Sequence, residues 1–325
     1  MINRHVLVYY AWSRPGENDA PLHVIEDRFP ALFESRRMGF PRFHEFSNPH
    51  QFDQGIAGFL DHIMKRNFTD FVELAAALTG QSVTEIERVT DDGTLTPLEA
   101  RLLDGVDTLI VISFDSLRTA QTAASGEIEA VRTFLGHADH LAFICPHHDI
   151  GDVTDLPENE QLQHQIAEFQ HHGDETIPPR QRFGGFARSL LAGLGVPVEN
   201  RFGLRPAAQA DGSPAPIEAD TTLDRLGLLQ GVSTFNLHPH LPQLERLGKA
   251  VEKLDVLVRQ QIDLNAPPHP FADEHATFDA LLQSRPDTFA GSLLVSDTTL
   301  WSSTAGGVDS LRELWANVVQ RPLRS

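Results

Sequence analysis

Cysteine is nearly absent from this chain, because Cys145 is the only one among 325 residues. A single thiol excludes an intramolecular disulfide and every cysteine-rich zinc module, and it is typical of a reducing compartment. Apolar runs long enough to cross a bilayer are also absent from the sequence. The first residues enter a predicted strand directly, without the apolar core and cleavage site of a secretory signal peptide. We therefore expect a cytoplasmic location and no membrane partner.

Basic residues are scarce as well. The chain carries 26 Lys and Arg against 45 Asp and Glu, a formal net charge of -19, and Lys65, Lys249 and Lys253 are its only lysines. A surface of that sign repels the phosphates of nucleic acids unless it keeps a basic patch, and the sequence shows no such patch. The composition therefore favours a small-molecule substrate over a nucleic acid, and it leaves the formation of a homo-oligomer open.

Strand and helix patterns alternate along most of the chain. Residues 108–113, TLIVIS, form an uninterrupted apolar run that is typical of a strand covered on both faces. Residues 127–135 place apolar side chains on one helical face, and the next strand begins at Leu141. Strand, helix and strand with short connections predict a parallel βαβ unit. We further predict strands at 5–12, 83–89, 231–237, 254–262 and 292–296 and helices at 68–78, 158–172, 183–194 and 308–319.

These elements predict a single α/β domain over residues 1–325. Its expected architecture is a flavodoxin-like open parallel sheet with helices on both faces. The polar segment 209–216, QADGSPAP, interrupts the pattern, but strand-like residues resume after it. We therefore expect a surface excursion around 206–220 rather than a domain boundary.

A dense set of metal-capable side chains follows one predicted strand. The apolar residues 141–144 are stopped by Pro146, and His147, His148 and Asp149 come next, where the chain leaves the sheet. Neutral imidazoles and carboxylates are suitable ligands for Zn, Mn, Fe or Ni. The sequence therefore predicts a divalent transition metal at this point. The alternative is that adjacent histidines arise by composition, since the chain has 16 of them.

A second cluster of the same kind, His171, His172 and Asp174, follows a predicted helix. It is close enough along the chain to fold back over the first cluster. Together the two clusters would supply a metal site of nitrogen and oxygen ligands.

Three further polar segments also follow predicted strands: 238–240, the loop after Ile262, and 297–304. Ligands of open parallel sheets bind in the crevice outside the carboxyl ends of the strands, so these segments are expected to converge there. His238 and His240 flank Pro239 and are candidates for a catalytic or metal-binding role. Asp297 is a candidate for orienting a ligand or accepting a proton, and its alternative role is to cap the turn after the last strand.

Three other residues are candidates for binding substrate. Arg205 has the geometry to grip a carboxylate with two hydrogen bonds, although an ion pair within so acidic a protein is an equal alternative. Trp12 and Trp301 follow the first and the last predicted strands, and we expect them to wall the pocket.

The arrangement of these segments resembles a known family. The run TLIVIS, the helix EIEAVRTFL, a strand that ends near Cys145, and a late Asp-containing loop followed by two glycines and the helix LRELWANVV are similar to the class I glutamine amidotransferase-like superfold. The closer likeness is to its trehalose-utilisation-like branch, and it covers most of residues 1–205 and 231–320. The resemblance implies a flavodoxin-like sheet and a nucleophilic cysteine in a Gly-x-Cys-x-Gly turn.

Cys145 falls in the corresponding region but departs from the pattern of the family. The flanking glycines are missing, and Pro146 has no backbone N–H with which to donate to an oxyanion. We therefore interpret Cys145 as a small buried residue. The string His148-Asp149 also matches the signature of HD-type metal phosphohydrolases, but those residues lie in a helical bundle, whereas here a strand and Pro146 precede them.

These observations favour a metal-dependent hydrolase that acts on a small polar metabolite through a metal-activated water. Two alternatives remain open from the sequence. One is a hydrolase of the amidotransferase kind that depends on Cys145 and needs no metal. The other is a non-catalytic domain that binds a sugar or metabolite and uses its histidines only for hydrogen bonds.

Overall fold

The computed structural model describes residues 4–15, 65–115, 119, 121–148, 156–173 and 182–322, and every structural statement below concerns these residues. Two of the predicted metal ligands, Asp149 and Asp174, lie outside them.

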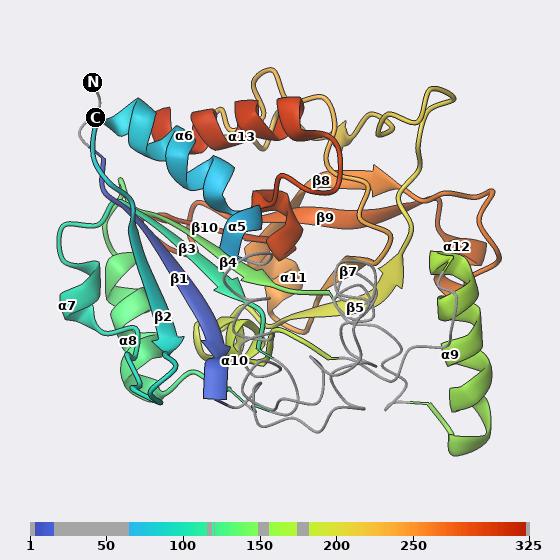
Figure 1. Ribbon diagram of the computed structural model, residues 1–325, viewed down its shortest axis with the longest axis horizontal. Coiled ribbons are helices and arrows are strands. Elements are labelled where there is room, and N and C mark those ends of the chain that lie inside the picture. Colours follow the sequence, from blue (N-terminus) through green and yellow to red (C-terminus); the bar gives the residue numbers. More distant parts are fainter. Residues whose placement is uncertain are drawn as a thin grey trace, which may run out of the picture.

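The centre of the molecule is an eight-stranded sheet with the strand order β2-β1-β3-β4-β10-β9-β8-β6 (Figure 1). The first five strands in this order pair in parallel. They are β2 (Thr84–Val89), β1 (Val6–Ser13), β3 (Thr108–Ser113), β4 (Leu141–Pro146) and β10 (Ser292–Ser296). The fold is thus α/β with a large, mostly parallel sheet, as the sequence predicts.

Three antiparallel strands extend the sheet beyond β10. They are β9 (Thr277–Ser284), β8 (Leu254–Gln261) and β6 (Glu218–Ala219). Two successive antiparallel pairings turn β8 back into the direction of β10, so the carboxyl ends of β3, β4, β10 and β8 lie at one edge. A separate antiparallel pair, β5 (Val198–Leu204) and β7 (Leu241–Arg246), packs on β9 through β7.

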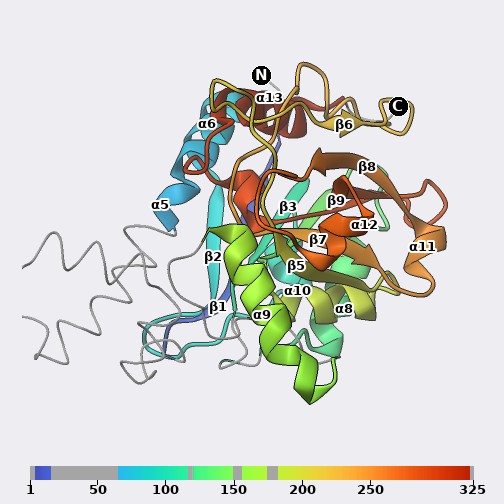
Figure 2. The same cartoon turned by 90° about the vertical axis from the view of Figure 1, so that its right-hand side faces the viewer.

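Helices cover both faces of the central parallel strands β1, β3 and β4, because these strands are buried and largely apolar on both faces. In β1, Val8 and Tyr10 belong to one buried core, whereas Leu7 and Tyr9 belong to the other. The first core packs against α6 (Thr69–Thr79) and α13 (Val308–Gln320). The second core packs against α7 (Ala100–Leu103), α8 (Ser125–Phe134) and α10 (Gly185–Gly193). Figure 2 shows α6 and α13 on the opposite side of the sheet from α8 and α10.

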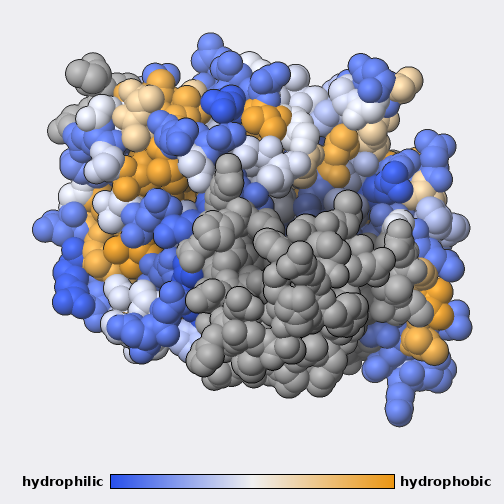
Figure 3. Space-filling model, in the orientation of Figure 1, coloured by the Kyte–Doolittle hydropathy of each residue, from blue (hydrophilic) through white to orange (hydrophobic). Residues whose placement is uncertain are grey.

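The remaining helices lie around this core. They are α5 (Lys65–Asn67), α9 (Glu158–His172), α11 (Ala250–Lys253), α12 (Pro270–Glu274) and the 3-10 helix η3 (Thr298–Trp301). α9 packs against β5, beside the small sheet (Figure 2). None of the helices in the described residues is long and apolar enough to span a membrane. On the face drawn in Figure 3, hydrophobic side chains gather in separate patches among hydrophilic ones.

One predicted strand is wrong. Residues 231–237 are irregular apart from a turn at Gly231 and a single isolated bridge between Thr234 and Pro216. The strand of this region, β7, begins only at Leu241. The backbone of 231–237 is satisfied elsewhere, because the amides of Ser233 and Thr234 bond to the hydroxyl of Ser310. Part of the predicted surface excursion around 206–220 belongs to the sheet, because Glu218–Ala219 forms the edge strand β6 and pairs with β8.

Candidate metal centre

The ends of two neighbouring parallel strands bring His147, His148 and Asp297 together. β4 and β10 pair in parallel, so the residues that follow them start from adjacent points of the same edge. Asp297 caps η3, where its Oδ1 accepts the amide N–H of Thr299 at 2.8 Å. Its Oδ2 lies 3.9 Å from Nδ1 of His147 and 3.7 Å from Nδ1 of His148. All three side chains are buried.

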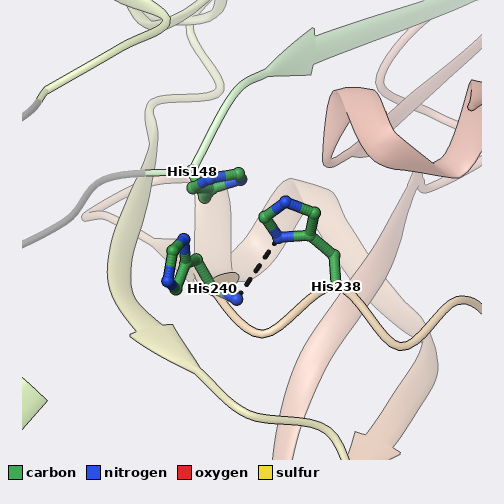
Figure 4. Close-up of side chains that lie close together, drawn as sticks. All are labelled: His148, His238 and His240. Carbon is green, nitrogen blue, oxygen red and sulfur yellow. Dashed lines mark hydrogen bonds between the residues drawn. The ribbon is translucent and has the colours of Figure 1, made fainter. Parts of the chain in front are cut away.

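His238 and His240 approach the same place from the loop before β7. The ring centroids of His148 and His238 are 4.5 Å apart, those of His148 and His240 are 5.5 Å apart, and those of His238 and His240 are 5.4 Å apart. One ligand atom from each of the three rings lies within 4.8 Å of the others. Figure 4 shows the three rings gathered around one space beyond the end of β4. The structure thus brings together His148, His238 and Asp297. His148 and Asp297 follow strands, as the sequence predicts, whereas His238 lies in an irregular segment before β7 and not at the end of a strand.

Hydrogen bonds hold the histidine loop in place. Buried Asn236 donates from Nδ2 to Oγ1 of Thr299 at 3.1 Å and accepts the amide of His238 on Oδ1 at 3.1 Å. Its carbonyl accepts Nε2 of Gln260 on β8 at 3.1 Å. Because one amide side chain joins the loop to η3 and its carbonyl joins it to the sheet, His238 is positioned by elements that lie far apart in the sequence. The same side chains, Asn236, Gln260, Asp297 and Thr299, line a small recess next to the histidines.

The protonation of His238 bears on its use as a ligand. Its Nδ1 accepts the backbone N–H of His240 at 3.3 Å (Figure 4), so the neutral ring carries its proton on Nε2. A metal ion binds only an unprotonated ring nitrogen. Binding through Nε2 would move the proton to Nδ1 and replace this long hydrogen bond.

Burial sets the charge states of the cluster. It lowers the pKa of His238 well below the usual value, and the nearby imidazoles of His148 and His240 lower it further. Burial also raises the pKa of Asp297 to about 6, although the hydrogen bonds from Thr299 and the nearby His238 act in the opposite direction. The ring of His238 is therefore neutral near pH 7, which is the form in which histidine binds metals.

His147 and His172 lie beside this group and are partly committed to other contacts. Nδ1 of His147 is 2.7 Å from Oγ1 of Thr298. The ring of His172 lies 4.4 Å from that of His240, and its Nε2 contacts the carbonyl of Gly203.

The predicted metal role of His171 is not supported by its contacts. Its Nδ1 bonds to the carbonyl of Pro267 at 2.8 Å, and its Nε2 accepts the amide of Arg205 at 3.1 Å. Both ring nitrogens therefore serve the backbone, and no lone pair remains for an ion. His171 fastens the end of α9 to two neighbouring loops.

The three residues predicted to bind substrate lie elsewhere. Arg205 is exposed and pairs with Asp263, with Nε 3.3 Å from Oδ2, which is the ion pair that the sequence left open. Trp12 is fully buried and donates to Glu87 at 3.1 Å. Trp301 is buried at the packing of η3 against the sheet. Both tryptophans belong to the buried core, because the strand ends that carry them are still covered by helices. Their buried position does not agree with the predicted role in walling a pocket.

Cys145 is also a core residue. Its Sγ lies 3.4 Å from the hydroxyl of Ser296 and accepts the indole N–H of Trp301 at 3.3 Å. Burial raises the pKa of the thiol to about 12. The side chain is therefore an inaccessible thiol near pH 7, whereas a nucleophile must be an accessible thiolate.

A second group of metal-capable side chains, His164, Glu168 and His269, is not among the residues predicted from the sequence. One ligand atom from each lies within 4.8 Å of the others. Burial acts to raise the pKa of Glu168, but its contacts with the two imidazoles hold it at about 2. The four-residue spacing of His164 and Glu168 was a signal that could have found this pair, because it places both on one helical face. His269 lies in the loop after Ile262, which the sequence predicts to reach the carboxyl ends of the strands, but it was not among the predicted metal ligands.

The described donors at the first site are thus the imidazoles of His148, His238 and His240, with the carboxylate of Asp297 next to them. Such nitrogen and oxygen donors suit Zn, Fe, Mn or Ni. Comparison of the chain with protein-family models and with curated proteins finds no match.

Proposed function

We propose that this protein is a metal-dependent hydrolase in which His148, His238 and His240 bind a divalent transition metal and Asp297 assists the reaction. One observation carries the proposal. Oδ2 of Asp297 is buried and makes no hydrogen bond in the part of the chain that the structure describes, while three imidazoles converge beside it. A buried carboxylate oxygen without a donor is costly, and a nearby cation would offset that cost.

The spacing of the side chains supports an ion over a direct hydrogen bond. Nδ1 of His148 and Oδ2 of Asp297 are 3.7 Å apart. Hydrogen bonds between nitrogen and oxygen span about 2.7–3.2 Å. The observed distance is longer than such a hydrogen bond.

A metal ion in this position would lower the pKa of a bound water toward neutrality and polarise the bond to be cleaved. Asp297 would accept the proton of that water, because its buried Oδ2 accepts no hydrogen bond in the described residues and lies beside the imidazoles. His172 packs on His240 and would position it.

The fold agrees with this location of the site. The strand order β2-β1-β3-β4-β10 corresponds to the flavodoxin-like order 2-1-3-4-5, and we propose a flavodoxin-like core extended by three antiparallel strands. Ligands of such sheets bind outside the carboxyl ends of the strands, which is where β4 and β10 deliver His148 and Asp297. The amidotransferase-like resemblance, the cytoplasmic location and a small polar metabolite as substrate stay predictions from the sequence.

The alternative that depends on Cys145 is disfavoured by burial. A fully buried thiol with a pKa of about 12 would have to be exposed and ionised before it could attack a substrate. The non-catalytic alternative differs from the hydrolase in both metal content and turnover, so measuring the two together separates them.

The test uses full-length protein purified without an affinity tag, loaded with Zn or Mn and then dialysed. Metal content is measured by elemental analysis, and hydrolysis is measured with p-nitrophenyl acetate and p-nitrophenyl phosphate as probes. We expect His238→Gln to lose one metal equivalent per chain together with hydrolysis. We expect Asp297→Asn to keep the metal and to lose about 100-fold or more of the rate, the usual weight of a general base.

Two controls decide between the alternatives. His137→Gln replaces an exposed histidine before the amino end of β4, at the opposite edge of the sheet, and should change neither quantity. Cys145→Ala should also retain both. A wild-type protein that takes up no Zn, Mn, Fe or Ni would overturn the proposal, and an inactive Cys145→Ala beside an active His238→Gln would replace it with the cysteine mechanism.

A further inference from the structure

Three side chains outside the site described above meet between α9 and the loop that precedes α12. His164 and Glu168 are one turn apart on α9 and therefore share a face. His269 is the residue before α12 and reaches the same point, and Figure 1 shows α12 beside α9. His171, whose ring lies 5.3 Å from that of His269, links the same two segments through its bond to Pro267.

We propose that His164, Glu168 and His269 form a second metal site, whose ion fastens α9 to the segment before α12. The site takes a divalent transition ion such as Zn²⁺, with two imidazole nitrogens and one carboxylate oxygen as its protein ligands.

The distances in this group fit an ion. Nε2 of His164 lies 3.7 Å and Nε2 of His269 lies 3.5 Å from Oε1 of Glu168. Both separations exceed the span of a hydrogen bond of about 2.7–3.2 Å. Both are close to the separation of about 3.4 Å between two tetrahedral zinc ligands.

Burial provides the second observation. The side chain of His269 is fully buried, and its Nε2 makes no hydrogen bond in the described residues although it points at Glu168. Glu168 is only 1% exposed. The ring nitrogen of His269 thus faces the buried carboxylate of Glu168 at 3.5 Å, a separation at which one ion would bind both atoms.

Binding of an ion would change the present hydrogen bond of His269. Its Nδ1 accepts the amide N–H of Phe271 at 3.1 Å and thereby caps α12. An ion on Nε2 would require the ring proton on Nδ1, so that the ring could no longer accept this amide. Binding of the ion therefore costs one cap of a five-residue helix, and the amide of Phe271 loses its acceptor.

This site is separate from the first one. Ions of a two-metal centre stand about 3.5–4 Å apart and share ligands. Here His171 and His172 lie between Glu168 and the histidines of the first site, and both nitrogens of His171 are occupied by backbone groups. The second ion would instead hold α9, whose last residue His172 rests on His240.

The experiment uses untagged full-length protein with His238→Gln as the background, so that the first site no longer contributes. Zn²⁺ and Co²⁺ binding is measured by equilibrium dialysis, and melting is followed with and without the ion. We expect one equivalent in this background, bound with a rise in melting temperature. Adding Glu168→Gln or His164→Gln should weaken binding at least about tenfold, because loss even of a ligand's supporting partner typically costs 10- to 100-fold.

Two further measurements keep the result decisive. Glu160→Gln, an exposed change on the same helix, should leave binding intact. His164 retains 14% of its side chain exposed, so His164→Gln answers the question even if Glu168→Gln fails to fold. Hydrogen exchange of the Phe271 amide should speed up when Zn²⁺ binds.

The proposal is overturned if the His238→Gln protein binds no Zn²⁺ or Co²⁺. It is also overturned if Glu168→Gln and His164→Gln bind as tightly as Glu160→Gln, which would show that the three residues are held by hydrogen bonds alone. Failure of the first site would look different, because His238→Gln would then bind as much metal as the wild type.

Discussion

Two buried carboxylates show, at the scale of single residues, how a structural group differs from a candidate functional one. Burial raises the pKa of Asp115 and of Asp297 to about 6 in both cases. Asp115 is fully engaged, since it accepts the hydroxyl of Ser113 at 2.6 Å and the amide of Phe186 at 3.0 Å. Asp297 keeps one oxygen without a hydrogen bond, toward the imidazoles. The perturbed pKa alone does not separate them, whereas the partners do.

The raised pKa of Asp115 makes the free energy of unfolding depend on pH. Its folded pKa of about 6 lies above the ordinary value of 3.8 for an aspartate, so the folded state binds the proton more tightly and Asp115 favours folding more as the pH falls. Between pH 7 and pH 5 this group should add about 1 kcal/mol to the free energy of unfolding. Urea denaturation of the wild type and of Asp115→Asn at both pH values measures it. An identical pH dependence in the two proteins would contradict the assignment.

At the scale of elements, the site depends on how closely the start of α10 approaches the end of β4. Gly184 precedes α10 with φ of 78°, and its N–H bonds to the carbonyl of Asp115 at 3.0 Å. A Cβ at this position would stand 2.7 Å from Cβ and 2.9 Å from Cα of Pro146, and 3.2 Å from the amide nitrogen of His147. Two conditions therefore require glycine at position 184: the left-handed backbone conformation and the lack of space for a side chain.

Gly184→Ala should accordingly destabilise the protein by roughly 2–4 kcal/mol, since about 1–2 come from the left-handed conformation and the rest from the contact with Pro146. Gly212→Ala is the matched control, because Gly212 has φ of 82° and nothing within 4 Å of its added Cβ. Gly212→Ala should lower the free energy of unfolding only by the contribution of the left-handed conformation, about 1–2 kcal/mol. Urea denaturation compares the two. Equal losses would mean that the approach to β4 is not tight.

The helix α9 also positions residues of the candidate sites. A single helix presents His164, Glu168, His171 and His172 to the small sheet and to the loop before α12. Moving this helix would therefore disturb both candidate metal sites, although none of its residues is among the three imidazole ligands proposed for the first one.

At the scale of the whole molecule, ions that bind only the folded chain must stabilise it by mass action. Each site would add about 2.7 kcal/mol when the free ion stands at 100 times its dissociation constant. Dialysis against a chelator should lower the melting temperature of the wild type, and lower it less in Glu168→Gln or His238→Gln. The double variant should not respond to the chelator. Calorimetry measures these shifts, and a wild type that melts at the same temperature with and without chelator would refute both sites.

Patterns within one segment predicted most of the fold. The predicted boundaries of β3, α9 and β10 agree with the structure, because each is defined by its own apolar run or helical spacing. The antiparallel strands β5, β7 and β9 were not predicted, since their alternation is weak and their pairing joins distant segments. Residues 231–237 were apolar enough to suggest a strand, but their amides found partners on α13 instead.

The sequence by itself determined the α/β class of the fold. It also determined that His148 and Asp297 lie near each other, because the ends of parallel strands meet at one edge of a sheet. Only the tertiary structure decided which of the candidates lie together. It united His238 and His240 with His148 through the bonds of Asn236, and it gave the nitrogens of His171 to the backbone. It also placed Trp12, Trp301 and Cys145 in the core and brought His269 to Glu168. The physical reason is that hydrogen-bond partners and burial depend on distant segments, which no local pattern records.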